Sequence, residues 1–304
     1  MKNKVVLIGC GNVGMAYAYA LFNQDVHVDE LVLIDLSTER IEGEVMDLNH
    51  CLSYSPTKID VKVGTYKDVK DARIIVIAAG ANQAVGETRM DLINKNSVIF
   101  KSIIDNVMKE GFKGIFLVAT NPLDVMTYLT LKYSKLPISN VIGSGTTLDT
   151  ARLRYLISEK VGICPKDIEA FVIGEHGDSE FVPWSRVTIG LNKIDNYLTK
   201  EEQTSIEEEV RNSAYEIIRK KGATYYGIGM SLVRITAAIL ENKNIILPVS
   251  SYDKENDVCI STPAVVNKDG VKGKIFIDLS KEEEEKLSNS IKIVKDAINK
   301  INYY

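Results

Sequence analysis

The residues best suited to proton chemistry in this chain lie in the segment Gly174–Glu175–His176–Gly177–Asp178. The chain has three histidines, and histidine is the side chain whose charge changes nearest neutral pH. His176 follows a predicted strand and is flanked by glycines, so it has little role in packing and open access to a ligand. His27 lies in a polar run and His50 follows a predicted helix. We expect both to be surface residues or indirect neighbours of a site.

Three further charged residues suit a reaction on a small acid. Asp149 and Arg152 are three residues apart, on one face of a predicted helix. An aspartate against one ring nitrogen of His176 would fix its tautomer and favour the imidazolium, and an arginine can bind a planar carboxylate. Arg89 lies in a glycine-containing loop, where it could stabilise negative charge on a substrate oxygen. The alternatives are a surface ion pair and an exposed arginine.

A glycine motif, Gly9–Cys10–Gly11–Asn12–Val13–Gly14, follows the first apolar run and opens a predicted helix. Its glycines allow a tight turn and the approach of a pyrophosphate to the helix N-terminus. Asp35 follows Gly14 by 21 residues and ends the second apolar run. A carboxylate there can accept hydrogen bonds from an adenosine ribose and would repel a 2′-phosphate. The motif therefore predicts NAD rather than NADP, with a glycine turn that binds nothing as the alternative.

The elements that position these residues fall into two patterns. Six short apolar segments alternate with helix-length segments in the first half, and continuous Val/Ile/Leu runs favour parallel strands buried on both faces. These segments are Lys4–Ile8, Leu31–Ile34, Ile59–Val63, Arg73–Ala79, Gly114–Ala119 and Asn140–Ile142. They predict an α/β fold whose core is a doubly wound parallel Rossmann sheet.

The second half predicts a mixed α+β catalytic domain with antiparallel strands. Acidic residues begin the predicted helix Glu201–Lys221, basic residues end it, and Gly222 is placed to cap it. The turn Asn267–Gly270 predicts a hairpin. Further expected elements are a helix from Thr146–Leu148, a strand at Ile168–Ile173, a helix ending near Asn244, strands Ile245–Ser251 and Val258–Val266, and a helix Lys281–Lys300. We expect an NAD-binding domain at residues 1–143 and a catalytic domain at 144–304.

Composition excludes several classes of function. The chain has 304 residues, 45% of them hydrophobic, and a formal net charge of −4. A mildly acidic chain without a basic cluster is a poor ligand for nucleic acid or an anionic membrane. No apolar run reaches the ~20 residues of a membrane span, and the N-terminus lacks a signal-peptide layout. The four cysteines are spaced too widely for a metal site and predict free thiols in the cytoplasm.

Together these segments resemble the bacterial L-lactate dehydrogenases of the lactate/malate dehydrogenase superfamily. The resemblance covers essentially the whole chain, and the GEHGD and LDTAR segments are its most specific carriers. The motifs are GCGNVG at 9–14, AGANQAVGETR at 79–89, ATNPLD at 119–124, GSGTTLDTARLR at 143–154, GEHGD at 174–178 and GATYYG at 222–227.

The resemblance implies a role for each matching residue. His176 would donate and accept the proton, with Asp149 as its orienting partner. Arg152 would bind the substrate carboxylate, and Arg89 would polarise the carbonyl. The substrate and nicotinamide pocket would include Gln83, Asn121 and Thr224. The cofactor would be bordered by Gly9, Gly11, Val13, Gly14, Asp35, Arg40, Tyr66, Gly80, Ala81, Ser102, Asn121 and Ser144. The family also implies a homotetramer.

The substrate and the regulation depend on three positions. Malate dehydrogenases typically carry arginine where this chain has Gln83, so the neutral side chain favours pyruvate and L-lactate over a dicarboxylate. Members activated by fructose 1,6-bisphosphate carry an arginine, here Arg154, and a histidine, here replaced by Glu169. A carboxylate would repel a bisphosphate, so we expect no activation. The alternatives are a malate or broader 2-hydroxyacid dehydrogenase and a non-catalytic NAD-binding regulator.

Overall fold

The structure is a computed structural model that describes residues 2–81 and 89–301, the side chain of Arg89 excepted. Its main sheet has nine strands in the order β12-β11-β10-β6-β5-β4-β1-β2-β3. The first six strands are all parallel, in the doubly wound order that the sequence predicted. They are β1 (Lys4–Ile8), β2 (Glu30–Ile34), β3 (Asp60–Val63), β4 (Ile74–Ile77), β5 (Ile115–Val118) and β6 (Val141–Gly143).

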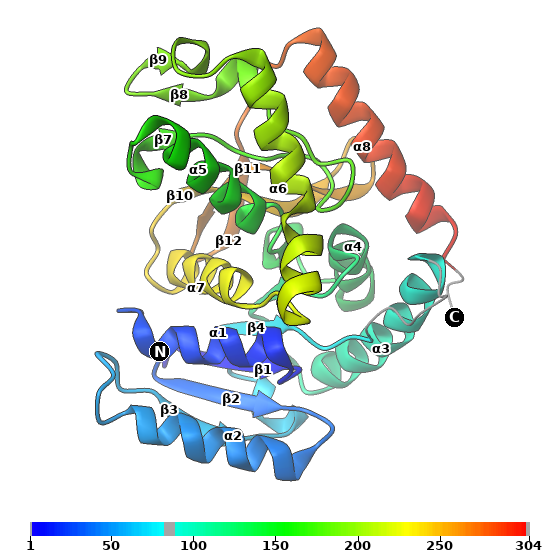
Figure 1. Cartoon of the computed structure of the whole chain (residues 1–304). Helices are drawn as coiled ribbons and strands as arrows, with labels where there is room; N and C mark the ends of the chain where they lie inside the picture. The colour runs from blue at the N-terminus through cyan, green and yellow to red at the C-terminus, as the bar shows by residue number, and fades with distance from the viewer. Residues whose placement is uncertain (1, 82–88, 302–304) are drawn as a thin grey trace.

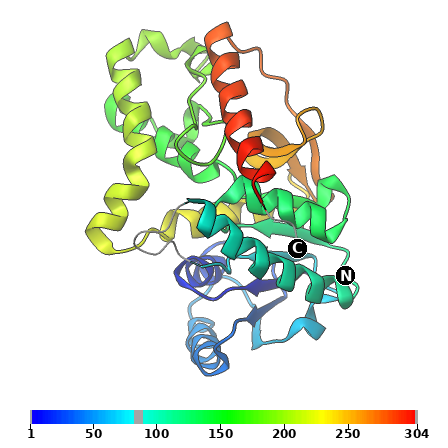
Figure 2. The same cartoon turned by 90° about the vertical axis from the view of Figure 1, so that its right-hand side faces the viewer.

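Helices cover both faces of this sheet, because alternate residues of each central strand point to opposite sides. In β1, Val5 and Leu7 face one core, whereas Val6 and Ile8 face the other. The first face packs against α1 (Asn12–Asn23), α2 (Thr38–Cys51) and α7 (Tyr226–Leu240). The second packs against α3 (Arg89–Lys109), α4 (Leu123–Ser134) and α8 (Lys281–Asn299), which lie on one side of the molecule (Figures 1 and 2).

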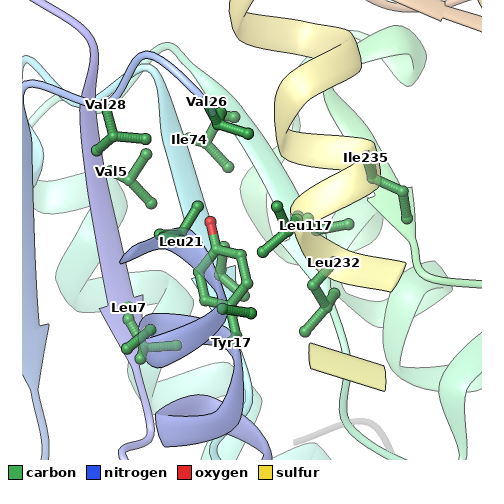
Figure 3. Close-up of a cluster of buried hydrophobic side chains, with 14 of the residues drawn as sticks. Val5, Leu7, Tyr17, Leu21, Val26, Val28, Ile74, Leu117, Leu232 and Ile235 are labelled. Carbon is green, nitrogen blue, oxygen red and sulfur yellow. The ribbon is translucent and has the colours of Figure 1, made fainter. Parts of the chain in front are cut away.

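Helices α1 and α7 are far apart in sequence but pack side by side on the first face. Tyr17 of α1 is fully buried between the sheet and Leu232 of α7 (Figure 3). Its hydroxyl is 2.9 Å from that of Thr236, so its polar end is satisfied inside the core. This packing fixes the segment after the glycine motif against the second half of the chain.

The antiparallel strands of the second half extend the same sheet. Strands β10 (Ile245–Asp253), β11 (Val258–Asn267) and β12 (Gly270–Lys274) form an antiparallel ribbon, and the predicted turn before Gly270 is confirmed. Ser250 of β10 pairs with Gly143 of β6. The hydrogen-bonded sheet therefore continues across the 143/144 junction, which lies just before α5 (Thr147–Val161).

A smaller layer beside the sheet carries the segment with His176. It contains β7 (Ile168–Glu169), β8 (Thr188–Ile189), β9 (Asn192–Lys193), α5 and α6 (Lys200–Lys221). The expected strand at Ile168–Ile173 was wrong beyond Glu169. Ile173 pairs instead with Phe181 and Gly174 with Ser261, because the chain leaves the small sheet to reach β11.

The predicted C-terminal end of α6 at Gly222 is confirmed. Thr199 caps α6 through a capping box with Glu202, and Gly222 ends it at φ +84°. Helix α7 ends at Leu240 rather than near Asn244, because Asn242 and Asn244 adopt positive φ. None of the helices in the described part of the chain is long and apolar enough to cross a membrane.

Candidate active site

The site begins where β1 and β4 end, at the point where the strand order reverses. Gly9 has a φ of +97°, and a Cβ there would lie 2.2 Å from the amide nitrogen of Ala79. A Cβ on Gly14 would lie 2.1 Å from the carbonyl oxygen of Gly9. Only glycine permits both contacts, so the motif holds the strand ends and α1 together as a tight turn.

A groove of about 600 Å³ lies above this turn and has the features of a dinucleotide site. A Cβ on Gly11 would meet only open space, and the first turn of α1 carries no acidic side chain that would repel a phosphate. The Asp35 carboxylate accepts hydrogen bonds from the amides of Cys10 and Leu36, both at 2.7 Å. The expected cofactor residues that line the groove are Gly9, Gly11, Asp35, Arg40, Tyr66, Gly80, Ala81 and Ser102.

These residues fit the adenosine and pyrophosphate half of NAD. The helix N-terminus offers amides to phosphate, and Asp35 holds a half-buried carboxylate at the end of β2. Arg40 donates to the carbonyl oxygen of Cys10 at 2.8 Å, so its guanidinium is drawn onto the glycine motif. The groove therefore holds one fixed carboxylate for a ribose and free amides for phosphates.

A second hollow of about 490 Å³ continues from the groove and contains Asp149, Arg152 and His176, three of the charged residues singled out from the sequence. Ala78, Gly80 and Ala81 line both spaces, so a ligand can extend from one into the other. Its lining includes Val13, Asn121, Asp149, Arg152 and His176. The structure thus brings Val13 and His176, which are 163 positions apart in the sequence, together at one end of the sheet.

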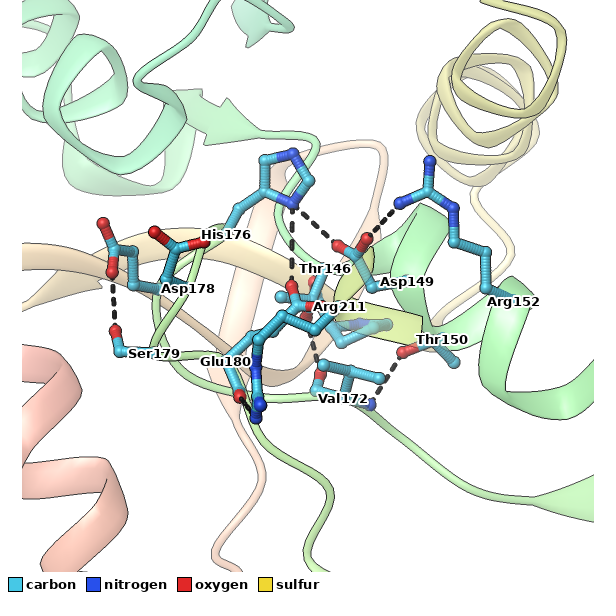
Figure 4. A network of polar contacts seen from close by, with 12 residues as sticks. Thr146, Asp149, Thr150, Arg152, Val172, His176, Asp178, Ser179, Glu180 and Arg211 are labelled. Atoms are coloured by element: carbon cyan, nitrogen blue, oxygen red, sulfur yellow. Dashed lines mark hydrogen bonds and ion pairs between the residues drawn. The ribbon is translucent and has the colours of Figure 1, made fainter. Parts of the chain in front are cut away.

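His176, Asp149 and Arg152 form one connected charge network (Figure 4). Nδ1 of His176 lies 2.7 Å from Oδ2 of Asp149, and Nη1 of Arg152 donates to Oδ1 of Asp149 at 2.8 Å. Asp149 is buried on α5 with 2% of its side chain exposed. The Asp149–Arg152 pair is therefore not a surface ion pair. Nε2 of His176 has no hydrogen-bond partner among the described residues and remains available to a ligand.

The network favours the imidazolium form of His176. Burial acts against that charge, but the attraction and the hydrogen bond of Asp149 outweigh it. Together they raise the pKa of His176 to about 9. At neutral pH the site therefore holds a proton that it can donate to a ligand in the hollow.

Asp124 of α4 is a buried residue that the sequence analysis did not assign. Its carboxylate accepts hydrogen bonds from the backbone amide of His176 at 2.7 Å and from the hydroxyl of Ser250 at 2.5 Å. It thus holds the backbone of the histidine segment against the main sheet. Asp124 belongs to the quoted ATNPLD segment, but nothing in the spacing of the sequence pairs it with a segment 52 residues later.

Other predicted site residues have different placements. Asn121 lines the hollow, and its carbonyl oxygen accepts from Asn96. Ser144 is buried, with its amide bonded to Val118, and does not line either space formed by the described residues. Thr224 lies between α6 and α7 and is also not among the lining residues of these spaces. Gln83 lies outside the described residues. Arg89 is the first residue of α3, but its side chain lies outside the description.

Arg154 is not among the described residues that line the hollow. Its Nε donates to the carbonyl oxygen of Ala170 at 3.0 Å, and its guanidinium lies 5.3 Å from the ring centroid of Phe171. Burial lowers the pKa of Arg154, against the attraction of Glu169. The exposed carboxylate of Glu169 therefore attracts the guanidinium of Arg154.

Both halves of the chain match domains of one known family. Residues 3–143 match the NAD binding domain of the lactate/malate dehydrogenases, and residues 146–303 match their alpha/beta C-terminal domain. The chain belongs to the lactate/malate dehydrogenase family, a family of oxidoreductases, as its motifs predicted.

Individual relatives match over nearly the full length. The L-lactate dehydrogenase of Halalkalibacterium halodurans is 51% identical over 298 residues, which cover 97% of this chain and 96% of the relative. The structure of a lactate dehydrogenase enzyme from a Medee basin deep-sea metagenome library has a TM-score of 0.96 at 49% identity, covering 99% of both chains. The ligands-bound minor L-lactate dehydrogenase of Enterococcus mundtii has a TM-score of 0.97 at 41% identity, covering 100% of this chain and 99% of that one.

Proposed function

We propose that this chain is an NAD-dependent L-lactate dehydrogenase that interconverts pyruvate and L-lactate. The observation that carries the proposal is the buried His176–Asp149 contact of 2.7 Å, which lies beside Arg152 in the hollow that continues the cofactor groove. The identity of about 50% to L-lactate dehydrogenases supports the same reaction.

The chain's residues would divide the chemistry as follows. The glycine turn and Asp35 would hold the nicotinamide cofactor, which when bound would supply the hydride for the carbonyl carbon of the substrate. His176 donates the proton on Nε2 to the carbonyl oxygen and recovers it in the reverse reaction. Asp149 keeps the other ring nitrogen, Nδ1, protonated and holds the ring in place. Arg152 binds the substrate carboxylate with the guanidinium nitrogens that Asp149 does not use, and Arg89 is proposed to polarise the carbonyl.

Gln83 is the residue proposed to select the substrate. A neutral amide cannot neutralise the second carboxylate of oxaloacetate, whereas it tolerates the methyl group of pyruvate. Parallel assays of NADH oxidation with pyruvate and with oxaloacetate test this choice. A preference for oxaloacetate in kcat/KM would support a malate dehydrogenase instead.

A replacement of His176 tests the catalytic assignment itself. We expect His176→Asn to bind NADH but to lose at least ~100-fold in kcat for pyruvate, because the proton donor is gone. His50→Asn is the matched control, because His50 is exposed at the end of α2. Wild-type protein that binds NADH without oxidising it with any 2-oxo acid would favour a non-catalytic regulator.

We further propose a boundary between the two domains at residues 143/144 and a homotetramer in the cytoplasm. Exposed apolar side chains on three helices would be covered by neighbouring subunits. They are Met46 on α2, Tyr155 on α5 and Tyr226 on α7, with exposures of 63%, 55% and 70%. The described structure holds all four cysteines as free thiols, which suits a reducing compartment. Native mass spectrometry tests the assembly, and a stable monomer would contradict it.

A further inference from the structure

Glu180 is a buried acidic residue in the site to which the mechanism above gives no role. Its side chain is 6% exposed, and its Oε2 atom lies 4.0 Å from Nδ1 of His176, the nitrogen that Asp149 also contacts. Polar atoms of Asp149, His176 and Glu180 all lie within 4.8 Å of one another. Three ionisable groups therefore share one volume with little access to water (Figure 4).

Two carboxyl groups this close cannot both carry a negative charge without a large cost. The nearest cations favour the ionisation of Asp149, since both His176 and Arg152 bind its oxygens directly. Arg211 of α6 donates to the backbone carbonyl oxygen of Glu180 at 3.3 Å rather than to its carboxyl group. The other charged groups around the cluster are Asp124 of α4, Glu175 and Asp178 of the histidine segment, and Glu207 of α6, which pairs with Arg211.

We propose that Glu180 is a positioning residue that remains an uncharged carboxylic acid and donates a hydrogen bond to the carboxylate of Asp149. Burial and the negative charge of Asp149 raise the pKa of Glu180 well above its usual range. Burial also opposes the ionisation of Asp149. However, His176, Arg152 and the hydrogen bond from Glu180 outweigh it, and the pKa of Asp149 is lowered. The pair therefore shares one proton, which resides on Glu180.

An uncharged Glu180 has two consequences for the reaction. The imidazolium, the Arg152 guanidinium and the Asp149 carboxylate together carry one net positive charge, which matches a substrate with one carboxylate. An ionised Glu180 would cancel that charge. When His176 gives up its proton, Asp149 loses an ionic partner but keeps the hydrogen bond from Glu180. Glu180 thus keeps Asp149 ionised and in place throughout turnover. This inference rests on the proposed function only for the catalytic role of His176.

Titration of the histidines by NMR tests whether Glu180 is uncharged, and it requires no turnover. The chain has three histidines, so ring-labelled histidine gives three signals, and His176→Asn assigns the one from the site. His27 and His50 are exposed and serve as internal references. We expect Glu180→Gln to leave the titration midpoint of His176 within about 0.5 units, because one neutral hydrogen-bond donor replaces another. A midpoint lowered by about 1–3 units, as expected for a lost carboxylate charge, would overturn the proposal.

Steady-state kinetics then distinguish a positioning role of Glu180 from a purely structural role in packing. We expect Glu180→Ala to lower kcat for pyruvate about tenfold with a smaller change in KM, because Asp149 and His176 lose their support. Glu180→Gln should recover most of that loss. An alanine variant with wild-type kcat would overturn the positioning role. If the alanine variant does not fold, the NMR comparison of wild type and Glu180→Gln still decides. Wild-type protein inactive with 2-oxo acids would refute the proposed function and leave the NMR result interpretable.

Discussion

Replacement of Asp149 by Asn gives a quantitative test of the charge network. The carboxylate lies 2.7 Å from Nδ1 of His176 and is the main group that opposes the effect of burial on this imidazole. Without its charge, the pKa of His176 should fall from about 9 to its ordinary value of 6.5 or below. A fall of about 2.5 units corresponds to about 3.4 kcal/mol of lost stabilisation of the imidazolium. At pH 8 the ring would then be about 30-fold less protonated.

The pH profile of kcat/KM measures this shift directly. Wild-type pyruvate reduction should be constant below about pH 9 and decline above it, because His176 must start protonated. Lactate oxidation should show the opposite trend. In Asp149→Asn the decline should begin near pH 6.5, and the deficit should shrink at pH 5.5. Glu159→Gln, an exposed charge removal on the same helix, is the matched control.

The same linkage predicts a change in stability. The folded state raises the pKa of His176, so the contribution of the imidazolium is fully present below pH 6.5 and is lost as the pH rises through about 9. An Asp149→Asn variant whose activity still declines near pH 9 would refute the reasoning, because another group would then set the pKa of His176. Thermal unfolding of the variant at several pH values separates this effect from a folding defect.

Three further perturbations have defined outcomes. Gly14→Ala places a Cβ 2.1 Å from the carbonyl oxygen of Gly9, so the affinity for NADH, measured by fluorescence titration, should fall at least ~10-fold. Gly43→Ala is the control, because a Cβ there meets open space, and it should keep the wild-type affinity. Asp124→Ala leaves the partly buried amide of His176 and the buried hydroxyl of Ser250 without their partner, so the free energy of unfolding should fall by about 2–5 kcal/mol in urea denaturation. An unchanged midpoint would contradict the anchor role. Fructose 1,6-bisphosphate should not activate the enzyme, because Glu169 carries a negative charge; activation at micromolar levels in a titration would overturn that expectation.

Much of the fold was predictable from the sequence because its signals are local. Continuous apolar runs mark strands buried on both faces, and the two cores observed on either side of the sheet follow from that pattern. The C-terminal cap of α6 was also predictable, since Gly222 directly follows the basic last turn of the helix. The strand expected at Ile168–Ile173 failed because its later residues pair with Phe181 and Ser261, and no local pattern encodes partners that distant.

The candidate site, too, was predictable only in part from the sequence. The sequence by itself determined the kinds of chemistry available: the glycine turn with Asp35, and the types of residue at His176, Asp149 and Arg152. Only the tertiary structure decided that Glu180 and Asp124 belong to this site, since α4, α5 and the histidine segment meet there. The physical reason is that ionisation depends on distance and burial rather than on sequence separation. The sequence supplies the charged groups, and the fold decides which of them carry charge.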